Sequence, residues 1–277
     1  MVKKYGIIGA IVGDVIGSAY EFNNVKRVDF ELFKNETEYT DDSILTLATM
    51  DVLNKKNKKY GYKKAYYGFG IKYPDGYGPG FVSWLFAEKQ EPYNSWGNGS
   101  AMRVSPVGWA FDSMEEVLKE AKRSAEVTHN HPEGIKGAQA TAAAVYMART
   151  GKSKHEIKKI ISETFQYNLN RTIDEIRPDY EFDVSCQGSV PPAIIAFLES
   201  SDFENAIRLA VSLGGDSDTI ACITGAISEA FYGEIPDYIA AKVLRMLPLE
   251  FLEIIAEFSK IDLLEIVANV KHIQSLL

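Results

Sequence analysis

Two short acidic segments, far apart in the chain, carry the residues best suited to chemistry. The first is TDDS at residues 40–43, and the second is GGDSDT at residues 214–219. Carboxylates beside apolar helices are costly to bury alone, and a ligand set made only of oxygen favours hard ions such as Mg²⁺, Mn²⁺ or Ca²⁺. Four carboxylates and two threonine hydroxyls are enough for two metal ions that share ligands. The predicted ligands are Thr40, Asp41, Asp42, Asp216, Asp218 and Thr219.

The segment at residues 40–43 also has a simpler interpretation. A hydroxyl or acidic side chain at a helix start caps free backbone N–H groups, and an acid there suits the helix dipole. Two consecutive aspartates exceed what a cap requires. At residues 214–219 two glycines allow a sharp turn before the aspartates, and neither segment has the ligand pattern of an EF-hand. The second segment therefore favours a metal site, and capping stays an alternative for the first.

Two further acids, Asp14 and Glu21, lie seven residues apart near the N-terminus. Seven residues are two helical turns, so both side chains face the same side if the first predicted helix persists. Asp14 needs partners when it is buried, and it either orients metal ligands and water or caps a nearby loop. Glu21 lies where the helix must end, and we predict that it acts as a general acid or base above the metals.

A glycine-containing loop with the sequence YNSWGNGSAMR occupies residues 93–103. Loops of this kind bind phosphate oxygens through backbone N–H groups when a helix follows, and residues 104–111 are expected to supply one. The aromatic residues around it suit a nucleobase, although aromatic side chains more often lie in cores or lids. Arg103 is suited to a phosphate or, as we favour, to a buried carboxylate. His129, predicted at a helix start, is suited to donate to phosphate.

Apolar spacing of the helical kind runs through almost the whole chain, so we predict an all-α fold. Residues 25–32 alternate in the manner of a strand, but this segment is short enough to be a loop. The glycine-, proline- and aromatic-rich stretch at residues 73–106 is predicted as a long functional loop. Four helices are expected from Ser217 onward, with prolines between them. The other expected helices begin at the N-terminal glycines and cover residues 45–53, 115–125, 133–149, 154–166, 190–199 and 203–212.

The first predicted helix has glycines at positions 9, 13 and 17, which form a ridge without side chains. Each glycine within a helix lowers its stability by about 1 kcal/mol relative to alanine, so three glycines spaced four residues apart need a structural or functional reason. Small residues at positions 217, 221 and 225 repeat the spacing late in the chain. We predict that these two rows face each other and let their helices approach closely.

The composition limits the class of protein. A chain of 277 residues with 46% hydrophobic and 25% charged residues is typical of a globular unit with a large core. No linker or repeat divides it, so we predict one domain over residues 1–277. The net charge of −8, with lysine clusters only at residues 55–64 and 152–159, argues against DNA binding. The apolar start is too short for a membrane span, and the unpatterned Cys186 and Cys222 favour a reducing, cytoplasmic location.

The ordered set of motifs resembles the ADP-ribosylglycohydrolase family over nearly the whole chain. The resemblance implies an all-α orthogonal helical fold, a binuclear Mg²⁺ or Mn²⁺ centre, and cleavage of the C1″ N- or O-glycosidic bond of ADP-ribose. Five motifs in the family's order are far more specific than any one of them. They are GxxxGDxxG at residues 9–17 with Glu21, TDDS at 40–43, GNGxxMR at 97–103, Thr128-His129, and GGDSDT at 214–219.

This resemblance also assigns roles by matching position. The six predicted metal ligands match those of the family, and Trp96 stands where an aromatic residue flanks the adenine. Glu21 resembles the glutamate near the scissile bond in members that act on serine-linked or polymeric ADP-ribose. Asp75 resembles the acidic loop residue of arginine-specific members, so the linkage stays open, and the expected partner is ADP-ribose or an ADP-ribosylated protein. The residues that match the diphosphate-holding segments are Ser95, Gly97, Asn98, Gly99 and His129.

Two other functions remain as alternatives. One is an ADP-ribose-binding or structural member that has lost catalysis, against which the intact set of six ligands argues. The other is a two-metal phosphohydrolase. The few histidines near the acids, and the lack of a lysine or arginine clamp for a transferred phosphate, weigh against it. Metal-dependent turnover excludes the first alternative, and phosphate release from nucleotides would support the second.

Overall fold

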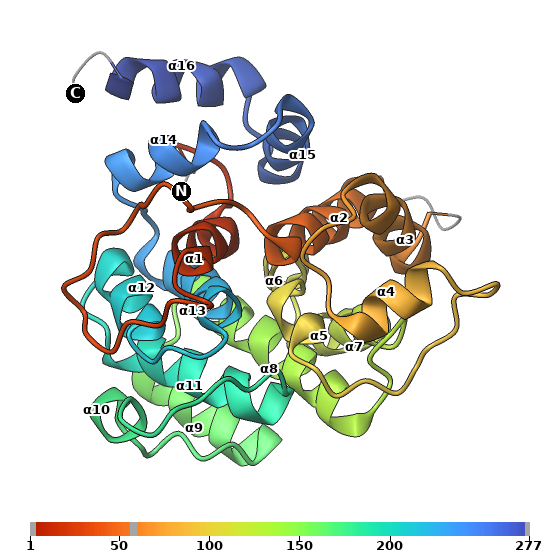
Figure 1. Ribbon diagram of the computed structural model, residues 1–277, viewed down its shortest axis with the longest axis horizontal. Coiled ribbons are helices and arrows are strands. Elements are labelled where there is room, and N and C mark those ends of the chain that lie inside the picture. Colours follow the sequence, from red (N-terminus) through yellow and green to blue (C-terminus); the bar gives the residue numbers. More distant parts are fainter. Residues whose placement is uncertain (1–3, 56–59, 275–277) are drawn as a thin grey trace.

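The structure is a computed structural model that describes residues 4–55 and 60–274, and within these ranges it is helical with no β-strand. One isolated bridge, between Gly97 and Ser185, is the only β-type pairing there. The predicted all-α fold is confirmed, and residues 25–32 form an irregular segment (Figure 1). The helices are α1 (Gly9–Ser18), α2 (Asp41–Lys55), α3 (Tyr62–Lys72), α4 (Pro79–Leu85), α5 (Gly99–Met102), α6 (Ser105–Ala110), α7 (Met114–Ala125), α8 (Pro132–Arg149), α9 (Lys154–Phe165), α10 (Ile173–Ile176), α11 (Cys186–Glu199), α12 (Phe203–Val211), α13 (Ser217–Tyr232), α14 (Asp237–Leu244), α15 (Leu249–Ser259) and α16 (Leu263–Gln274).

Helices α1 and α13 lie side by side (Figure 1). Their backbones are so close that a side chain on the α1 glycines has no room. A Cβ atom added to Gly13 would lie 1.9 Å from the Ala221 carbonyl oxygen, and one on Gly9 would lie 2.4 Å from that of Gly225. The predicted contact between the two rows of small residues is therefore confirmed. It places the end of α1 against the acidic segment at residues 214–219.

The start of α1 is capped by a side chain from α13 rather than by its own sequence. Ile8, at the N-cap position, offers no side-chain acceptor. The buried Glu229 accepts hydrogen bonds through Oε2 from the backbone N–H groups of Ile8 (3.1 Å) and Gly9 (2.7 Å). A carboxylate at this end satisfies free N–H groups and suits the helix dipole. Glu229 thus fixes α1 along its axis against α13, and this sets where α1 presents Asp14.

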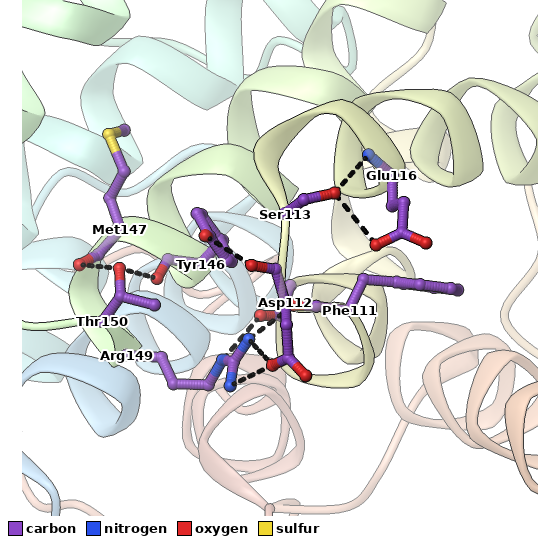
Figure 2. A network of polar contacts seen from close by, with 9 residues as sticks. Phe111, Asp112, Ser113, Glu116, Tyr146, Met147, Arg149 and Thr150 are labelled. Atoms are coloured by element: carbon purple, nitrogen blue, oxygen red, sulfur yellow. Dashed lines mark hydrogen bonds and ion pairs between the residues drawn. The ribbon is translucent and has the colours of Figure 1, made fainter.

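A polar network holds the end of α8 against the turn between α6 and α7 (Figure 2). Arg149 Nη2 donates to the Phe111 carbonyl oxygen (2.5 Å), and the guanidinium forms an ion pair with Asp112 (3.3 Å). The next residue, Ser113, accepts a hydrogen bond from the Glu116 N–H group (3.2 Å) and caps α7. These contacts fix the end of α8 against the end of α6 and the start of α7.

Two features of the helix pattern differ from the prediction. Residues 73–106 are not one long loop, because they contain α4, α5 and the start of α6, and α4 buries its apolar side chains. Helix α11 starts at Cys186 rather than at residue 190. Ser185 accepts a hydrogen bond from the Gly188 N–H group (3.0 Å), and this cap allows the earlier start despite the prolines that follow.

Helices α3 and α10 were not predicted. The buried side of α3 is built largely from aromatic residues such as Tyr62 and Tyr66, so its apolar spacing is hidden among tyrosines and lysines. Helix α10 is a single turn with a capping box at Thr172. In the lysine-rich segment at residues 55–64, residues 56–59 lie outside the described ranges, and the lysines of α3 are exposed.

Buried apolar side chains form a large cluster to which α1, α2, α8, α11 and α13 all contribute. A smaller cluster of valines and alanines lies between α6, α7 and α8. Since alanine is small, these helices approach closely and leave little space between them. None of the described helices combines the length and the apolar character that crossing a membrane requires.

Candidate metal and ligand site

A cavity of about 930 Å³ opens between the starts of α2 and α13 and the loops near residues 73–78 and 93–98. It brings together residues from segments that are far apart in the sequence. Asp14 and Trp96 are the only predicted site residues that do not line it. Those that do are Glu21, Thr40, Asp41, Asp42, Asp75, Ser95, Gly97, Asn98, Gly99, His129, Asp216, Asp218 and Thr219.

Asp14 is fully buried on α1 and uses both carboxylate oxygens to bind the start of α2. It accepts hydrogen bonds from Thr40 Oγ1 (2.6 Å), the Thr40 N–H group (3.0 Å) and the Ser43 N–H group (3.1 Å), and a further short one from Ser43 Oγ. Burial raises the pKa of Asp14, and these hydrogen bonds oppose the shift. Asp14 thus caps the start of α2 and, by the same hydrogen bonds, holds the Thr40 hydroxyl at the cavity wall, so both interpretations stay open.

The carboxylates at the starts of α2 and α13 are buried close to one another. Asp42 Oδ1 accepts a hydrogen bond from Thr219 Oγ1 (3.2 Å), whereas Asp42 Oδ2 is buried without a hydrogen-bond partner among the described residues. Burial, followed by the charges of neighbouring carboxylates, raises the pKa of Asp41, Asp42 and Asp218 well above the usual aspartate range. A divalent cation would pair the orphaned oxygen and neutralise these charges, so the residues present fit a hard metal ion.

Glu21 lies beyond the end of α1, which stops at Ser18, so it does not share a helical face with Asp14 as predicted. Turn hydrogen bonds follow the helix, among them one from the Glu21 N–H group to the Ser18 carbonyl (3.4 Å), and Glu21 reaches the cavity wall from this turn. One oxygen each of Glu21, Asp216 and Asp218 lies within 4.8 Å of the others, a spacing that a metal ion can bridge. Glu21 is therefore a candidate ligand, which the sequence analysis missed, as well as a candidate acid or base.

The half-buried Glu21 carboxyl also has unusual acidity. Burial, together with the charges of Asp216 and Asp14, raises the pKa of Glu21 to about 7. A carboxyl group with this pKa exists in both protonation states near neutral pH. Such a group can accept or release a proton during a reaction at that pH.

Asn98 connects the glycine-containing loop to the carboxylates. Its side-chain nitrogen Nδ2 donates to Asp216 Oδ2 (2.6 Å) and to Ser189 Oγ (2.9 Å). Its backbone N–H group donates to the Val184 carbonyl oxygen (2.7 Å). Because Asn98, Asp216 and Ser189 are buried, these hydrogen bonds fix both the orientation of Asp216 and the path of the loop. Asn98 thus acts on the carboxylate end of the cavity as well as on the loop.

The loop end of the cavity presents donors instead of carboxylates. The Gly97 N–H group donates to Ser95 Oγ (3.1 Å), and a Cβ atom added to Gly99 would lie 3.2 Å from His129 Nε2. His129 is not at a helix start as predicted, because His131 caps α8 and accepts a hydrogen bond from the Glu133 N–H group (3.1 Å). Burial, with the nearby charge of Arg103, lowers the pKa of His129 well below its usual range. A neutral imidazole therefore lies beside the glycine loop.

Trp96 stands next to the cavity rather than on its wall. Its ring is 51% exposed and packs edge-on against His131, with ring centroids 5.6 Å apart. The flanking residues Ser95 and Gly97 do line the cavity. An extended ligand that leaves the cavity past this loop would meet the exposed face of the indole.

Asp75 lies at the mouth of the cavity on an exposed loop. The next residue, Gly76, has a φ of +90° and passes close to Asp41, since a Cβ atom there would lie 3.3 Å from Asp41 Oδ1. The loop thus packs over the start of α2. The Asp75 carboxylate does not belong to the group formed by Glu21, Asp216 and Asp218.

Two exposed aromatic residues at the mouth were not singled out from the sequence. Phe22 is 81% exposed and Phe182 is 50% exposed, both line the cavity, and their rings stack with centroids 6.4 Å apart and an interplanar angle of 18°. Large apolar side chains left in solvent beside a cavity are typical of ligand or partner contacts. The only sequence signal was their position directly after Glu21 and Glu181, and the pairing itself depends on the tertiary fold.

Arg103 was expected to pair with a buried carboxylate, but it forms no ion pair with any residue that the structure describes. It is fully buried, and its guanidinium lies 4.1 Å from the ring centroid of Tyr66. Its Nη2 donates to Thr128 Oγ1 (2.7 Å) and to the Ser124 carbonyl oxygen (3.3 Å). The ring contact and these two acceptors replace the expected ion pair, and Arg103 also lines the cavity.

The glycine-packed helices, the buried oxygen ligands and the donor loop agree with one known family. The sequence model of the ADP-ribosylglycohydrolase family matches residues 4–269, so the chain belongs to this family. A solved structure titled "ADP-ribosylglycohydrolase-related protein complex" superposes with a TM-score of 0.70 over 92% of this chain and 95% of that one. Its sequence identity is 23%, so this likeness supports the fold alone.

Curated relatives match over most of their length. Human ADP-ribosylhydrolase ARH3 is 28% identical, with 83% of this chain and 86% of that protein covered. The putative ADP-ribosyl glycohydrolase L543 of Acanthamoeba polyphaga mimivirus is 27% identical, with coverage of 84% and 88%. An uncharacterised protein of Archaeoglobus fulgidus is 33% identical over half of each chain. The likeness to the first two extends along nearly the whole sequence rather than over isolated motifs.

Proposed function

We propose that this protein is a metal-dependent hydrolase that cleaves the C1″ glycosidic bond of ADP-ribose attached to a protein or another acceptor. The observation that carries the proposal is the cavity itself, which joins a cluster of buried carboxylates at one end to a glycine-containing loop and a neutral histidine at the other. Family membership and the names of the relatives support the same substrate class.

Two Mg²⁺ or Mn²⁺ ions are the proposed cofactors. The donor set contains only oxygen, and the orphaned Asp42 Oδ2 marks a place where a cation fits. Bound there, the ions would hold the ribose hydroxyls and stabilise negative charge beside the bond that breaks. The residues proposed to hold them are Thr40, Asp41, Asp42, Asp216, Asp218 and Thr219, with Glu21 as a candidate addition.

Glu21 is the proposed proton-transfer residue. Its carboxyl group lines the cavity beside Asp216 and Asp218, where it can take a proton from the attacking water and return one to the leaving group. Asp75 is the alternative, because it also lines the cavity, but it lies on an exposed loop. Which of the two transfers the proton depends on the linkage that is cleaved, and both are kept as candidates.

The loop end is proposed to bind the ADP part of the substrate. Ser95, Gly97, Asn98 and Gly99 line this end. The N–H groups of Gly97 and Asn98 already donate to Ser95 Oγ and the Val184 carbonyl oxygen, so the proposed donors to phosphate oxygens are the Ser95 hydroxyl and the Gly99 N–H group. A neutral His129 can donate a hydrogen bond there without needing a counter-ion. The exposed face of Trp96 is proposed as the stacking surface for adenine.

The experiment that tests this function is a panel of substrates with defined linkages. ADP-ribose attached to arginine, to serine, to an acetyl ester and to another ADP-ribose is incubated with the protein in Mg²⁺ or in EDTA. We expect free ADP-ribose to be released from at least one substrate in Mg²⁺ only. Full activity after exhaustive chelation would contradict the metal-dependent mechanism, and phosphate release instead of ADP-ribose would favour a phosphohydrolase.

A further inference from the structure

Arg103 is a charged residue in an unusual position. Its side chain has no exposed surface, and within the described part of the chain it forms no ion pair with a carboxylate. Only Nη2 donates hydrogen bonds there, while Nε and Nη1 are buried without a partner. A buried guanidinium of this kind is costly unless its charge acts on something. The shortest hydrogen bond of Arg103, from Nη2 to Thr128 Oγ1, identifies the group that Arg103 orients.

That hydrogen bond determines the orientation of the Thr128 hydroxyl. Arginine has no acceptor, so at 2.7 Å Arg103 Nη2 must donate and Thr128 Oγ1 must accept. The hydroxyl then has one proton left to donate. Among the described residues its one other hydrogen-bond partner is His129 Nδ1, also at 2.7 Å, so the hydroxyl proton points to that nitrogen. If Nδ1 carried a proton instead, the buried hydroxyl proton would have no acceptor.

The orientation of Thr128 in turn determines the tautomer of His129. A neutral imidazole has one N–H group, and because Nδ1 accepts, the proton lies on Nε2. Burial and the charge of Arg103 lower the pKa of His129, which keeps the ring neutral. His129 Nε2 lies beside the glycine loop, since Cβ atoms added to Gly99 and Gly97 would lie 3.2 and 3.4 Å from it. No hydrogen bond to Nε2 forms within the described residues.

We propose that Arg103 and Thr128 are positioning residues that fix His129 as an Nε2–H donor to the diphosphate of the ligand. This inference rests on the proposed function, because it takes ADP-ribose as the ligand of the cavity. Arg103 acts here through Thr128 and His129 rather than by direct contact. A merely structural Arg103, which holds the end of α5 against Ser124 of α7 and Tyr66 of α3, would not control where the imidazole proton lies.

The tautomer can be measured in the unmodified protein. Nitrogen-15 chemical shifts of the imidazole distinguish a protonated from an unprotonated ring nitrogen, and His129→Gln assigns the His129 signals among the four histidines. We expect Nε2 of His129 to carry the proton at neutral pH. In Thr128→Val, which keeps the shape and removes the hydroxyl, we expect a mixture of tautomers, and in Thr128→Ser we expect the original one. A wild-type ring protonated on Nδ1 would overturn the proposal.

Binding supplies the second readout. ADP-ribose and adenosine are titrated against wild type, Thr128→Val and Thr128→Ser, since adenosine lacks the diphosphate. Losing one well-oriented hydrogen bond to a charged group should weaken ADP-ribose binding about tenfold in Thr128→Val. Adenosine binding should change less than twofold, and Thr128→Ser should restore the wild-type pattern. Equal losses for both ligands would show a general structural effect and would overturn the proposal.

Failure of the proposed function would look different. If the wild-type protein released no ADP-ribose from any substrate yet bound ADP-ribose with the Thr128-dependent pattern, hydrolysis would be wrong and the positioning role correct. If the wild-type protein bound no ADP-ribose, the diphosphate part of the inference would be wrong, and the tautomer measurement would still decide whether Thr128 orients His129.

Discussion

The two ends of the cavity are built in opposite ways. At the carboxylate end, Asp42 and Asp218 are 2% and 4% exposed and stand at the starts of helices that α1 packs against closely. At the mouth, Phe22 and Phe182 are 81% and 50% exposed and lie on irregular segments. Buried groups on packed helices tolerate little change, whereas exposed loop residues tolerate much. The carboxylate end, called the closed end below, therefore suits the bond cleavage that is common to all substrates. The mouth suits the acceptor group that differs between substrates.

The largest expected effect tests whether the closed end performs the chemistry. Replacing the buried carboxylate in Asp216→Asn should reduce turnover below detection, because a proposed metal ligand is lost. The metal-free variant should melt no lower than wild type, since burial and neighbouring charge already raise the pKa of Asp216. Activity and thermal unfolding in EDTA check both points. Asp112→Asn, on an aspartate whose side chain is 96% exposed, is the control and should retain activity.

The second prediction separates proton transfer from binding. Glu21→Gln should lower kcat about 10²–10⁴-fold, the usual range for general acid–base catalysis. Single-turnover rates and ADP-ribose titrations should show that free ADP-ribose still binds. Asp75→Asn is the matched variant at the open end. Normal turnover in Glu21→Gln together with a large loss in Asp75→Asn would show that Asp75, at the mouth, transfers the proton. The chemistry would then not be confined to the closed end.

The third prediction concerns pH and metal. The pKa of Glu21 is raised to about 7, and those of Asp41, Asp42 and Asp218 are also raised, so the metal-free folded protein retains protons that the unfolded chain releases. Stability without metal should therefore be highest below the ordinary carboxyl pKa and should fall as pH rises through about 7.

Mg²⁺ should reverse this loss, since it binds the ionised site. Stabilisation by ligand binding is about 2.7 kcal/mol at a free concentration one hundred times Kd. Thermal unfolding at pH 5 and pH 8, in EDTA or in Mg²⁺, measures the effect. In Glu21→Gln the difference between the two pH values in EDTA should be smaller. An Mg²⁺ effect as large at pH 5 as at pH 8 would contradict the assignment.

The fourth prediction tests the packing that supports the closed end. Gly13→Ala places a Cβ atom 1.9 Å from a backbone oxygen of α13, so the helices must separate, and overpacking typically costs about 1–3 kcal/mol. Gly68→Ala is the matched control, because nothing lies within 4 Å of a Cβ atom there, and it should stabilise by about 0.4–1 kcal/mol. Denaturant unfolding measures both changes. A stable Gly13→Ala variant would show that the close contact is not required.

The smallest expected effect lies at the mouth. Trp96→Ala should weaken ADP-ribose binding by roughly 1 kcal/mol, the lower end of the range for stacking on a base, because half of the ring remains in solvent. Titrations with ADP-ribose and with ribose 5-phosphate measure it, since the second ligand lacks the base. The variant should lose affinity for ADP-ribose only. A loss for both ligands would place Trp96 in the structure of the loop rather than in adenine contact.

Sequence reasoning found what local patterns determine. The two acidic segments, the glycine spacing of α1 and its counterpart on α13 are all visible over a few residues, and their contact follows from the shape of the helices. Most helices were found for the same reason. Helix α3 was missed because its buried side includes Tyr62 and Tyr66, whose polar ends hide the apolar spacing.

Long-range geometry could not be predicted in this way. Glu21 meets Asp216 and Asp218 only because α1 ends early and a turn redirects the chain, and neither event has a strong local signal. The stacking of Phe22 on Phe182 joins two irregular segments that are 160 positions apart. The partner of Arg103 was predicted wrongly, since charge suggested a carboxylate, whereas the fold offers a ring and a hydroxyl.

The hydrogen bonds of Asp14 and Asn98 have a consequence for how the site takes up its ions. Asp14 holds Thr40 and the first turn of α2, and Asn98 holds Asp216, so protein groups already fix these two proposed ligands. Their conformational entropy is lost when the chain folds and not when an ion arrives. Ion uptake then requires dehydration and proton release, with little ordering of the chain. An ion should therefore exchange without local unfolding of the chain. Its affinity should rise with pH, because binding releases protons from the carboxyl groups.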